Sequence, residues 1–269
     1  MMKIAKANEL YFEVPNEVWY SFYNSPYISH KLGSAIDVYY PEKALFPLEE
    51  GKVKEIKKIK ADFLIIIEIS DELCLKVLHV KPEVDIGDKL YLGDEFGELI
   101  SSGSFMRWSD RHAHFELRHC NDRYRAKGGL PIEPIILRKV FATSKNKFEV
   151  VERRDNYCWI KPLNAKEKNL TPLLFNDISI EGGFPHYKYG AIFGKEKEAN
   201  IFGKSVLIKE YLHNKVGIFE ANFKIFANGQ RIKGIGIYCN QEKIKLIGNS
   251  FKEGDIVEMK ILQYETKID

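Results

Sequence analysis

The chain lacks the features by which composition alone assigns a protein to a functional class. Its 269 residues carry 41 Lys and Arg against 38 Asp and Glu, a formal net charge of only +3. Nucleic-acid-binding domains usually have a clear basic excess, so this balance gives no reason to expect a nucleic-acid partner. The longest strongly apolar run, Phe63 to Ile67, is too short to cross a bilayer, and we expect no membrane segment.

Glutamine is scarce, and no motif for secretion or for binding nucleotides stands out. Lys, Glu and Ile are abundant, while Gln occurs only at Gln230, Gln241 and Gln263. This bias is reported for proteins from hot environments, so we expect a thermophilic source. Residues 1–14 lack the apolar core of a secretion signal, and we expect a cytoplasmic protein. We find no complete Gly-x-x-x-x-Gly-Lys-Ser/Thr phosphate loop and no nucleophile elbow.

The cysteines are few and widely spaced. Cys74, Cys120, Cys158 and Cys239 contain no Cys-x-x-Cys pair, which excludes the commonest cysteine-based metal knuckle. We therefore interpret all four as small buried apolar side chains.

Strand signals dominate the rest of the chain. Segments rich in branched residues and bracketed by turn formers indicate strands, whereas helical periodicity is confined to short pieces at 17–23 and 166–169. The predicted fold class is therefore mainly β. The expected strands are 53–59, 64–69, 74–80, 112–118, 135–140, 148–151, 205–209, 216–226 and 256–261.

Glycine and proline residues predict turns and one domain boundary. The segment 44–53 reads as strand, turn and strand with its turn at Glu-Gly, and 85–97 has two Gly-Asp pairs that fit tight turns. Paired turns of this kind are typical of barrel-sandwich-like β-sandwiches. Gly128–Pro134 has two glycines and two prolines. We expect one domain at 1–130 and a second, smaller β domain at 141–269.

The run His112-Ala113-His114 is the strongest chemical signal. In a strand, side chains two residues apart share a face, so the two imidazoles point the same way. Such a pair is costly in a packed core and useful at a metal. His30, Asp37 and one of His112 or His114 would supply the three protein ligands of a catalytic zinc site. His79 lies at a predicted strand end, where its side chain could reach a cleft.

Residues 28–118 resemble the lysostaphin-type (LytM-like) zinc metallopeptidases, which have the duplicated hybrid motif fold. The closing strand of that family, His-x-His-Phe-Glu-hydrophobic-Arg, is similar to residues 112–118. In the usual pattern the first zinc histidine stands four residues before the aspartate. That position is Gly33 here, and His30 stands seven before Asp37. The other similar segments are Ala35–Val38, Pro47–Val53, Val77–Val80 and Val84–Gly97.

The resemblance implies a set of roles and a function. His30, Asp37 and His114 would bind Zn²⁺, and His112 and His79 would act as general base or stabilise the oxyanion. The implied function is hydrolysis of a peptide or other amide bond by a metallopeptidase-like domain at 1–130. The alternative is a binding or scaffold protein that keeps the fold, with or without the metal, and hydrolyses nothing. The domain at 141–269 would then bind a protein partner. A biotinyl or lipoyl carrier would need a lysine at a hairpin tip, and none is evident.

Overall fold

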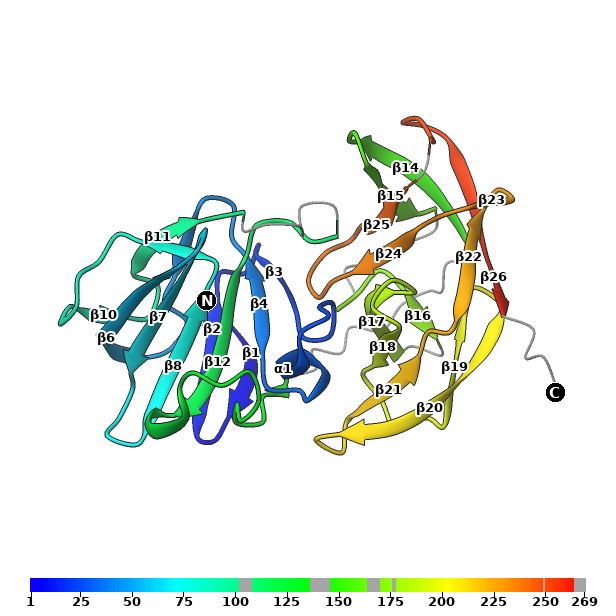
Figure 1. The fold of residues 1–269 in the computed structure, drawn as a ribbon. Helices are drawn as coiled ribbons and strands as arrows, with labels where there is room; N and C mark the ends of the chain where they lie inside the picture. The colour runs from blue at the N-terminus through cyan, green and yellow to red at the C-terminus, as the bar shows by residue number, and fades with distance from the viewer. Residues whose placement is uncertain (102–107, 136–145, 164–169, 176–177, 249, 264–269) are drawn as a thin grey trace. The chain divides into compact units, whose positions relative to one another are not determined.

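A computed structural model gives the fold for residues 1–101, 108–135, 146–163, 170–175, 178–248 and 250–263 (Figure 1). Two compact units divide the chain. The first comprises Met1–Phe22 and Pro26–Ile136, and the second comprises Tyr23–Ser25 and Leu137–Asp269. Both consist almost entirely of β-strands, which confirms the predicted fold class of a mainly β protein with two domains.

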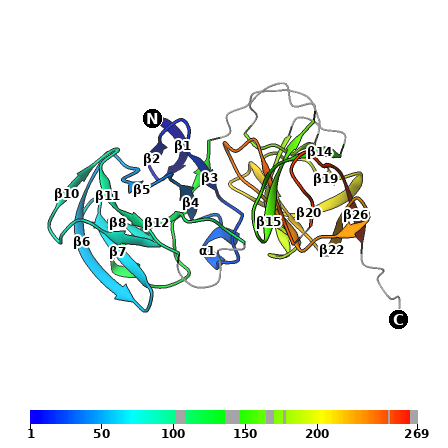
Figure 2. The ribbon, with the colours of Figure 1, turned by 90° about the horizontal axis from the view of Figure 1, so that it is seen from above.

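The first unit is built from three antiparallel sheets. Its elements are β1 (Met2–Ala7), β2 (Leu10–Val14), β3 (Trp19–Ser21), α1 (Ile28–Lys31), β4 (Ile36–Tyr39), β5 (Lys43–Leu45), β6 (Glu50–Ile59), β7 (Asp62–Glu68), β8 (Leu73–Leu78), β9 (Val80–Pro82), β10 (Lys89–Tyr91), β11 (Glu95–Leu99), β12 (Ala113–His119), η2 (Cys120–Asp122) and β13 (Glu133–Pro134). The largest sheet has the order β10-β6-β7-β8-β12-β4-β3, and Figure 2 shows its strands from above. The two smaller sheets are β13-β1-β2 and β5-β11-β9.

The second unit has one large sheet. Its strands are β14 (Lys147–Arg153), β15 (Tyr157–Pro162), β16 (Leu174–Phe175), β17 (Ile178–Phe184), β18 (Tyr189–Ile192), β19 (Glu198–Ile201), β20 (Lys204–Leu212), β21 (Val216–Glu220), β22 (Phe223–Ala227), β23 (Gln230–Arg231), β24 (Gly234–Ile237), β25 (Ile244–Ile247) and β26 (Ile256–Gln263). The sheet order is β19-β20-β21-β18-β17-β24-β25-β15-β14-β26-β22-β23, with β16 paired to β17. Branched aliphatic and Phe side chains form the hydrophobic core of this unit.

Alternation along β12 separates an apolar face from a polar one. Ala113, Phe115 and Leu117 are fully buried on one face, and Phe115 packs against Phe96 with ring centroids 6.4 Å apart. The intervening residues of β12 are polar, yet they are buried as well. A polar side chain that loses contact with water needs hydrogen-bond partners. The buried polar face of β12 is therefore a candidate functional site.

Several local predictions are confirmed and others are wrong. Gly87 and Gly93 have φ of 103° and 90°, as tight Gly turns require. Residues 17–23 contain strand β3 rather than a helix, because pairing with β4 decides the local conformation (Trp19 opposite Tyr39). The turn expected at Glu-Gly lies earlier, since β6 already begins at Glu50. The segments 166–169 and 136–140 lie outside the described residues.

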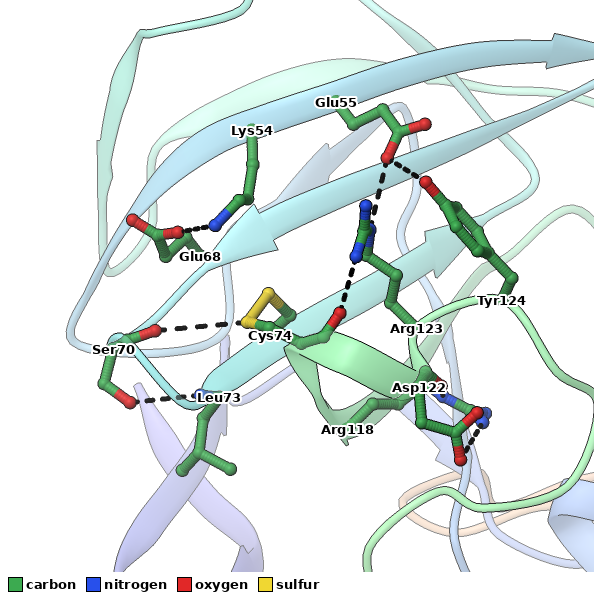
Figure 3. Close-up of a disulfide and its surroundings, with 11 residues drawn as sticks. Lys54, Glu55, Glu68, Ser70, Leu73, Cys74, Arg118, Asp122, Arg123 and Tyr124 are labelled. Atoms are coloured by element: carbon green, nitrogen blue, oxygen red, sulfur yellow. Dashed lines mark hydrogen bonds and ion pairs between the residues drawn. A yellow bond between two sulfur atoms is a disulfide. The ribbon is translucent and has the colours of Figure 1, made fainter.

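The expectation for two of the cysteines is also wrong. Cys74 and Cys120 form a disulfide across 46 residues, which ties β8 to the short η2 turn after β12 (Figure 3). Leu64 and Ile66 of β7 pack around Cys74. Cys158 and Cys239 are buried free thiols, as expected. Cys74 pairs with Arg118 in the register, so the disulfide adjoins the polar face of β12.

Candidate metal centre

Three elements bring His30, Asp37 and His114 together. Asp37 lies on β4 directly opposite His114 of β12, and directly paired residues of an antiparallel sheet share a face. His30 comes from α1, which lies beside β4 in Figures 1 and 2. All three side chains are buried, with 0%, 2% and 1% of their respective surfaces exposed. The structure thus unites the three residues that the sequence predicted as metal ligands.

The distances between the candidate ligand atoms fit one small cation. His30 Nε2 lies 3.1 Å from Asp37 Oδ1 and 3.2 Å from His114 Nδ1. His114 Nδ1 lies 2.8 Å from the same Asp37 oxygen. Ligands of a tetrahedral ion at the usual zinc distances are about 3.3 Å apart. The three atoms could therefore bind a common ion with only a small expansion of the cluster.

The hydrogen bonds on the far side of each imidazole fix which nitrogen faces the cluster as an acceptor. His30 Nδ1 is 2.6 Å from the carbonyl oxygen of Phe22, which can only accept, so Nδ1 carries the hydrogen. His114 Nε2 is 3.0 Å from Glu116 Oε1, a carboxylate oxygen, so Nε2 carries the hydrogen there. If both rings are neutral, the lone pairs of His30 Nε2 and His114 Nδ1 point toward each other and toward the Asp37 carboxylate. That arrangement is repulsive without a cation, and it fits the donor set of a metal.

A single helical turn compensates for the unusual spacing between the first histidine and the aspartate. After α1 the chain reverses at Gly33, whose φ of 64° favours glycine. The Gly33 N–H donates to the His30 carbonyl at 3.0 Å, and the Ser34 N–H donates to the Ser29 carbonyl at 2.9 Å. These turn bonds return the chain to β4 with His30 facing Asp37. The seven-residue spacing is therefore accommodated by the turn.

His112 is held with its second nitrogen toward the cluster. Its Nδ1–H donates to the carbonyl oxygen of Asp110 at 2.7 Å, and its Nε2 lies 3.6 Å from Asp37 Oδ2. Burial lowers the pKa of His112, while the Asp37 carboxylate raises it, and the result is about 4. The ring is therefore neutral near pH 7, with the Nε2 lone pair available as a proton acceptor.

His79 belongs to the same group of rings. Its ring centroid lies 5.1 Å from that of His112 and 6.0 Å from that of His114. The residue has a left-handed backbone with φ of 66°, between β8 and β9. Asp62 supports this conformation, because its carboxylate accepts from the His79 N–H at 3.0 Å and from Nδ1 at 2.6 Å. The structure thus places all five predicted site residues in one cluster.

Sequence reasoning missed the residues that support this cluster. Glu116 connects His114 to two buried basic groups. Lys76 donates to Glu116 Oε1 at 3.0 Å, and Arg118 donates to Oε2. Burial raises the pKa of Glu116, but the His114 and Lys76 contacts outweigh it and lower that pKa to about 2. Burial likewise disfavours protonation of His114, yet Asp37 and Glu116 raise its pKa to about 9 in the absence of an ion.

The sequence contained a signal for the buried charges around Glu116. The closing strand alternates Phe and Leu with Glu116 and Arg118, so a buried sheet face would carry adjacent opposite charges. Nothing in the sequence around Asp62 indicates a role at the site, because Asp62 is brought close to His79 only when β7 and β8 pair.

The fold and the site together define a mainly β protein with two domains and a buried His-Asp-His cluster suited to a metal ion. Residues 13–134 match the family model described as "Domain of unknown function (DUF8155) N-terminal domain". Residues 142–262 match the model of the C-terminal domain of the same family. The two matches together span most of the chain, and the protein belongs to this family.

Likenesses to solved structures are weak. One is to the catalytic domain of a mutant of the prophage-encoded M23 protein EnpA from Enterococcus faecalis. That likeness has 24% identity and a TM-score of 0.28 over 36% of this chain and 72% of that chain. Another is to a zinc-containing peptidase from Vibrio cholerae, with 22% identity and a TM-score of 0.29 over 45% of this chain and 38% of that chain. At these scores neither likeness carries a conclusion about this protein. No curated protein matches.

The part of the chain that the structure describes contains no helix that could span a membrane.

Proposed function

We propose that the first unit is a zinc-dependent hydrolase of peptide or other amide bonds. The observation that carries the proposal is the convergence of His30 Nε2, Asp37 Oδ1 and His114 Nδ1 within 3.2 Å of one another. The resemblance of residues 28–118 to lysostaphin-type metallopeptidases supports an amide as the bond cleaved.

The donor set favours zinc over harder cations. Two imidazole nitrogens and one carboxylate oxygen suit zinc, whereas magnesium and calcium prefer oxygen ligands. Three protein ligands leave one position open for water or substrate, as catalytic zinc sites do. When bound, the ion would activate a water for attack and polarise the carbonyl of the substrate.

His112 would act as the general base. Its Nε2 lies 3.6 Å from Asp37 Oδ2, at the edge of the proposed ligand set, and can accept a proton there. The water oxygen bonds to the carbonyl carbon and its proton passes to His112 Nε2. Collapse of the tetrahedral species breaks the C–N bond, and the same proton goes to the departing amine. The second proton of the water, left on the carboxylic acid, then passes to the amine. The products are one carboxylate and one ammonium group, so atoms and charge balance.

His79 would stabilise the negative charge that develops on the carbonyl oxygen. For this it must carry hydrogen on both ring nitrogens, and the Asp62 carboxylate 2.6 Å from Nδ1 would compensate the resulting positive charge. Tyr27 lies against both rings, at 6.4 Å from His79 and 6.2 Å from His114 between centroids. Burial, followed by Asp37 and Asp62, raises the pKa of Tyr27, so its hydroxyl stays protonated near neutral pH.

The test combines metal analysis with a cleavage assay. We expect one zinc per chain and cleavage of members of a fluorogenic peptide library. His112→Ala should keep the zinc and lose at least about a hundredfold in kcat/KM, because it removes the base and none of the ligands.

His119→Ala is the matched control, since His119 is the exposed last residue of the same strand. It should leave both metal content and activity unchanged. A zinc-loaded protein that cleaves no peptide or amide in the library would contradict the hydrolase and support the non-catalytic alternative.

A further inference from the structure

A large cleft opens beside His112 in the first unit. Its volume is about 770 Å³, within the range of sites that bind small molecules and short peptides. The lining comes from β3, from the end of β4 and the turn after it, and from the segment just before β12. The aromatic and charged residues of the lining include Glu17, Trp19, Tyr39, Glu42, Asp110 and Arg111.

Tyr39 joins this cleft to the proposed reaction centre. It follows Asp37 by two residues on β4, so both side chains lie on the same face of the sheet. The Tyr39 hydroxyl is hydrogen-bonded to Ser109 Oγ at 2.9 Å, and its ring centroid lies 5.2 Å from that of His112. A chain extending from the metal cluster past His112 would therefore enter the cleft over Tyr39.

An aromatic pair forms one wall of the cleft. Trp19 and Tyr39 are opposite each other in the β3–β4 register and stack with centroids 4.0 Å apart and planes 5° apart. Trp19 is only half-buried, so part of this residue is exposed to solvent at the cleft. Indole and phenol rings offer apolar contact and also attract cations to their faces.

The charges around these rings are mainly negative. Glu17, Glu42 and Asp110 line the cleft, and Arg111 is the one basic residue among its described lining. The chain as a whole has a net charge of +3, so the cleft differs in sign from the average of the protein. Neither Glu17 nor Glu42 forms an ion pair with a residue in the described part of the chain, which leaves both available to a ligand.

We infer that this cleft binds the substrate beside the scissile bond and selects peptides with a lysine or arginine side chain. This inference rests on the proposed hydrolase. Three carboxylates attract the cationic group. The exposed part of Trp19, with the buried Tyr39 ring stacked behind it, contacts the aliphatic stem and the charge of that group. An acidic peptide would meet like charge and bind more weakly.

The test uses peptides that differ at one position near the cleaved bond. That position is lysine, norleucine or glutamate, and both peptide ends are blocked so that only the side chain carries charge. A further norleucine peptide with a free amine shows whether a chain terminus can replace the side chain. Zinc-loaded protein gives kcat/KM, and protein treated with EDTA gives Kd by calorimetry.

We expect the lysine peptide to exceed the glutamate peptide by roughly tenfold or more in both kcat/KM and affinity, the scale of two solvent-exposed charge contacts. The difference should shrink at 0.5 M salt, which screens such contacts over about 4 Å. Glu17→Gln/Glu42→Gln should lower kcat/KM for the lysine peptide roughly tenfold, mainly through KM, and leave the norleucine peptide unchanged.

Glu72→Gln/Glu149→Gln is the control, because it removes the same charge at two exposed positions outside the cleft lining. Equal cleavage and binding of the lysine and glutamate peptides would overturn the inference and leave the hydrolase intact. An equal loss in the control variant would also overturn it. If the lysine peptide binds more tightly than the glutamate peptide but neither is cleaved, the hydrolase is rejected, and the proposal that the cleft binds cationic side chains stands.

Discussion

Replacing Glu116 by glutamine tests whether the buried charges beside His114 support the metal centre. Glu116 is 2% exposed and accepts from His114 Nε2, Lys76 and Arg118. Glutamine has the same size and keeps one acceptor oxygen. Its amide NH2, however, replaces the second oxygen with a donor, which would face a Lys76, Arg118 or His114 group that also donates. The variant therefore leaves Lys76 and Arg118 buried without their shared counter-charge.

Two effects should follow, and their sizes can be estimated separately. Removing one partner of a buried ion pair costs about 3–5 kcal/mol of unfolding free energy. The pKa of Glu116 gives a similar figure, since a shift from 4.5 to about 2 corresponds to roughly 3 kcal/mol. Loss of a carboxylate behind a ligating histidine weakens metal binding by about 10- to 100-fold.

The pH dependence has a definite sign. The folded-state pKa of Glu116 lies below its unfolded value of 4.5, so its contribution is fully present above pH 4.5. It is lost as the pH falls from about 4.5 to about 2. At neutral pH the full difference between wild type and Glu116→Gln should be visible.

Urea denaturation of the metal-free protein measures the first effect, and competition with a chromophoric chelator for zinc measures the second. Glu98→Gln is the control, because Glu98 pairs with Lys81 at 3.0 Å on the surface. That control should change the unfolding free energy by less than about 1 kcal/mol. If Glu116→Gln matched the control in stability and kept wild-type zinc affinity, the supporting role assigned to this carboxylate would be refuted.

Three further predictions concern other parts of the molecule. Reduction of the Cys74–Cys120 disulfide, which closes a separation of 46 residues, should lower the unfolding free energy by about 4 kcal/mol in the chain-entropy relation. Equal urea midpoints with and without reductant would contradict this. Asp62→Asn should reduce kcat about a hundredfold at unchanged zinc content, because His79 loses the carboxylate on Nδ1; a variant with wild-type kcat would exclude the role given to His79. Burial, with a smaller effect of Lys245, lowers the pKa of His186 to about 3, so the unfolded chain binds more protons between about pH 6.5 and 3. Stability of the second unit should therefore fall by roughly 2 kcal/mol between pH 7 and 5, and His186→Gln should abolish that part of the slope in urea titrations; an unchanged slope would show that His186 does not contribute.

The sequence predicted those features that depend on strand periodicity. Alternation in residues 112–118 placed His112 and His114 on one face, and the register of β12 with β4 then brought Asp37 opposite His114. The Gly turns at Gly87 and Gly93 were equally predictable, because a positive φ restricts the residue type.

Features set by tertiary contacts were not predictable in the same way. A helical turn of four residues, α1, is too short to give a periodic signal, yet it carries His30. Residues 17–23 have a helical pattern but form β3, since pairing with β4 outweighs local propensity. The disulfide joins cysteines 46 residues apart, and no local pattern reveals such a pairing.

The proposed hydrolase depends most directly on a cation bound among His30, Asp37 and His114. Calorimetric titration of the metal-free protein with zinc, for wild type and for Asp37→Ala, measures this in one experiment. We predict one zinc per wild-type chain and a loss of binding of at least about a hundredfold in the variant, because Asp37 Oδ1 contacts both histidine nitrogens. Equal stoichiometry and affinity in the two proteins would show that Asp37 is not a metal ligand and that this cluster is not the zinc site.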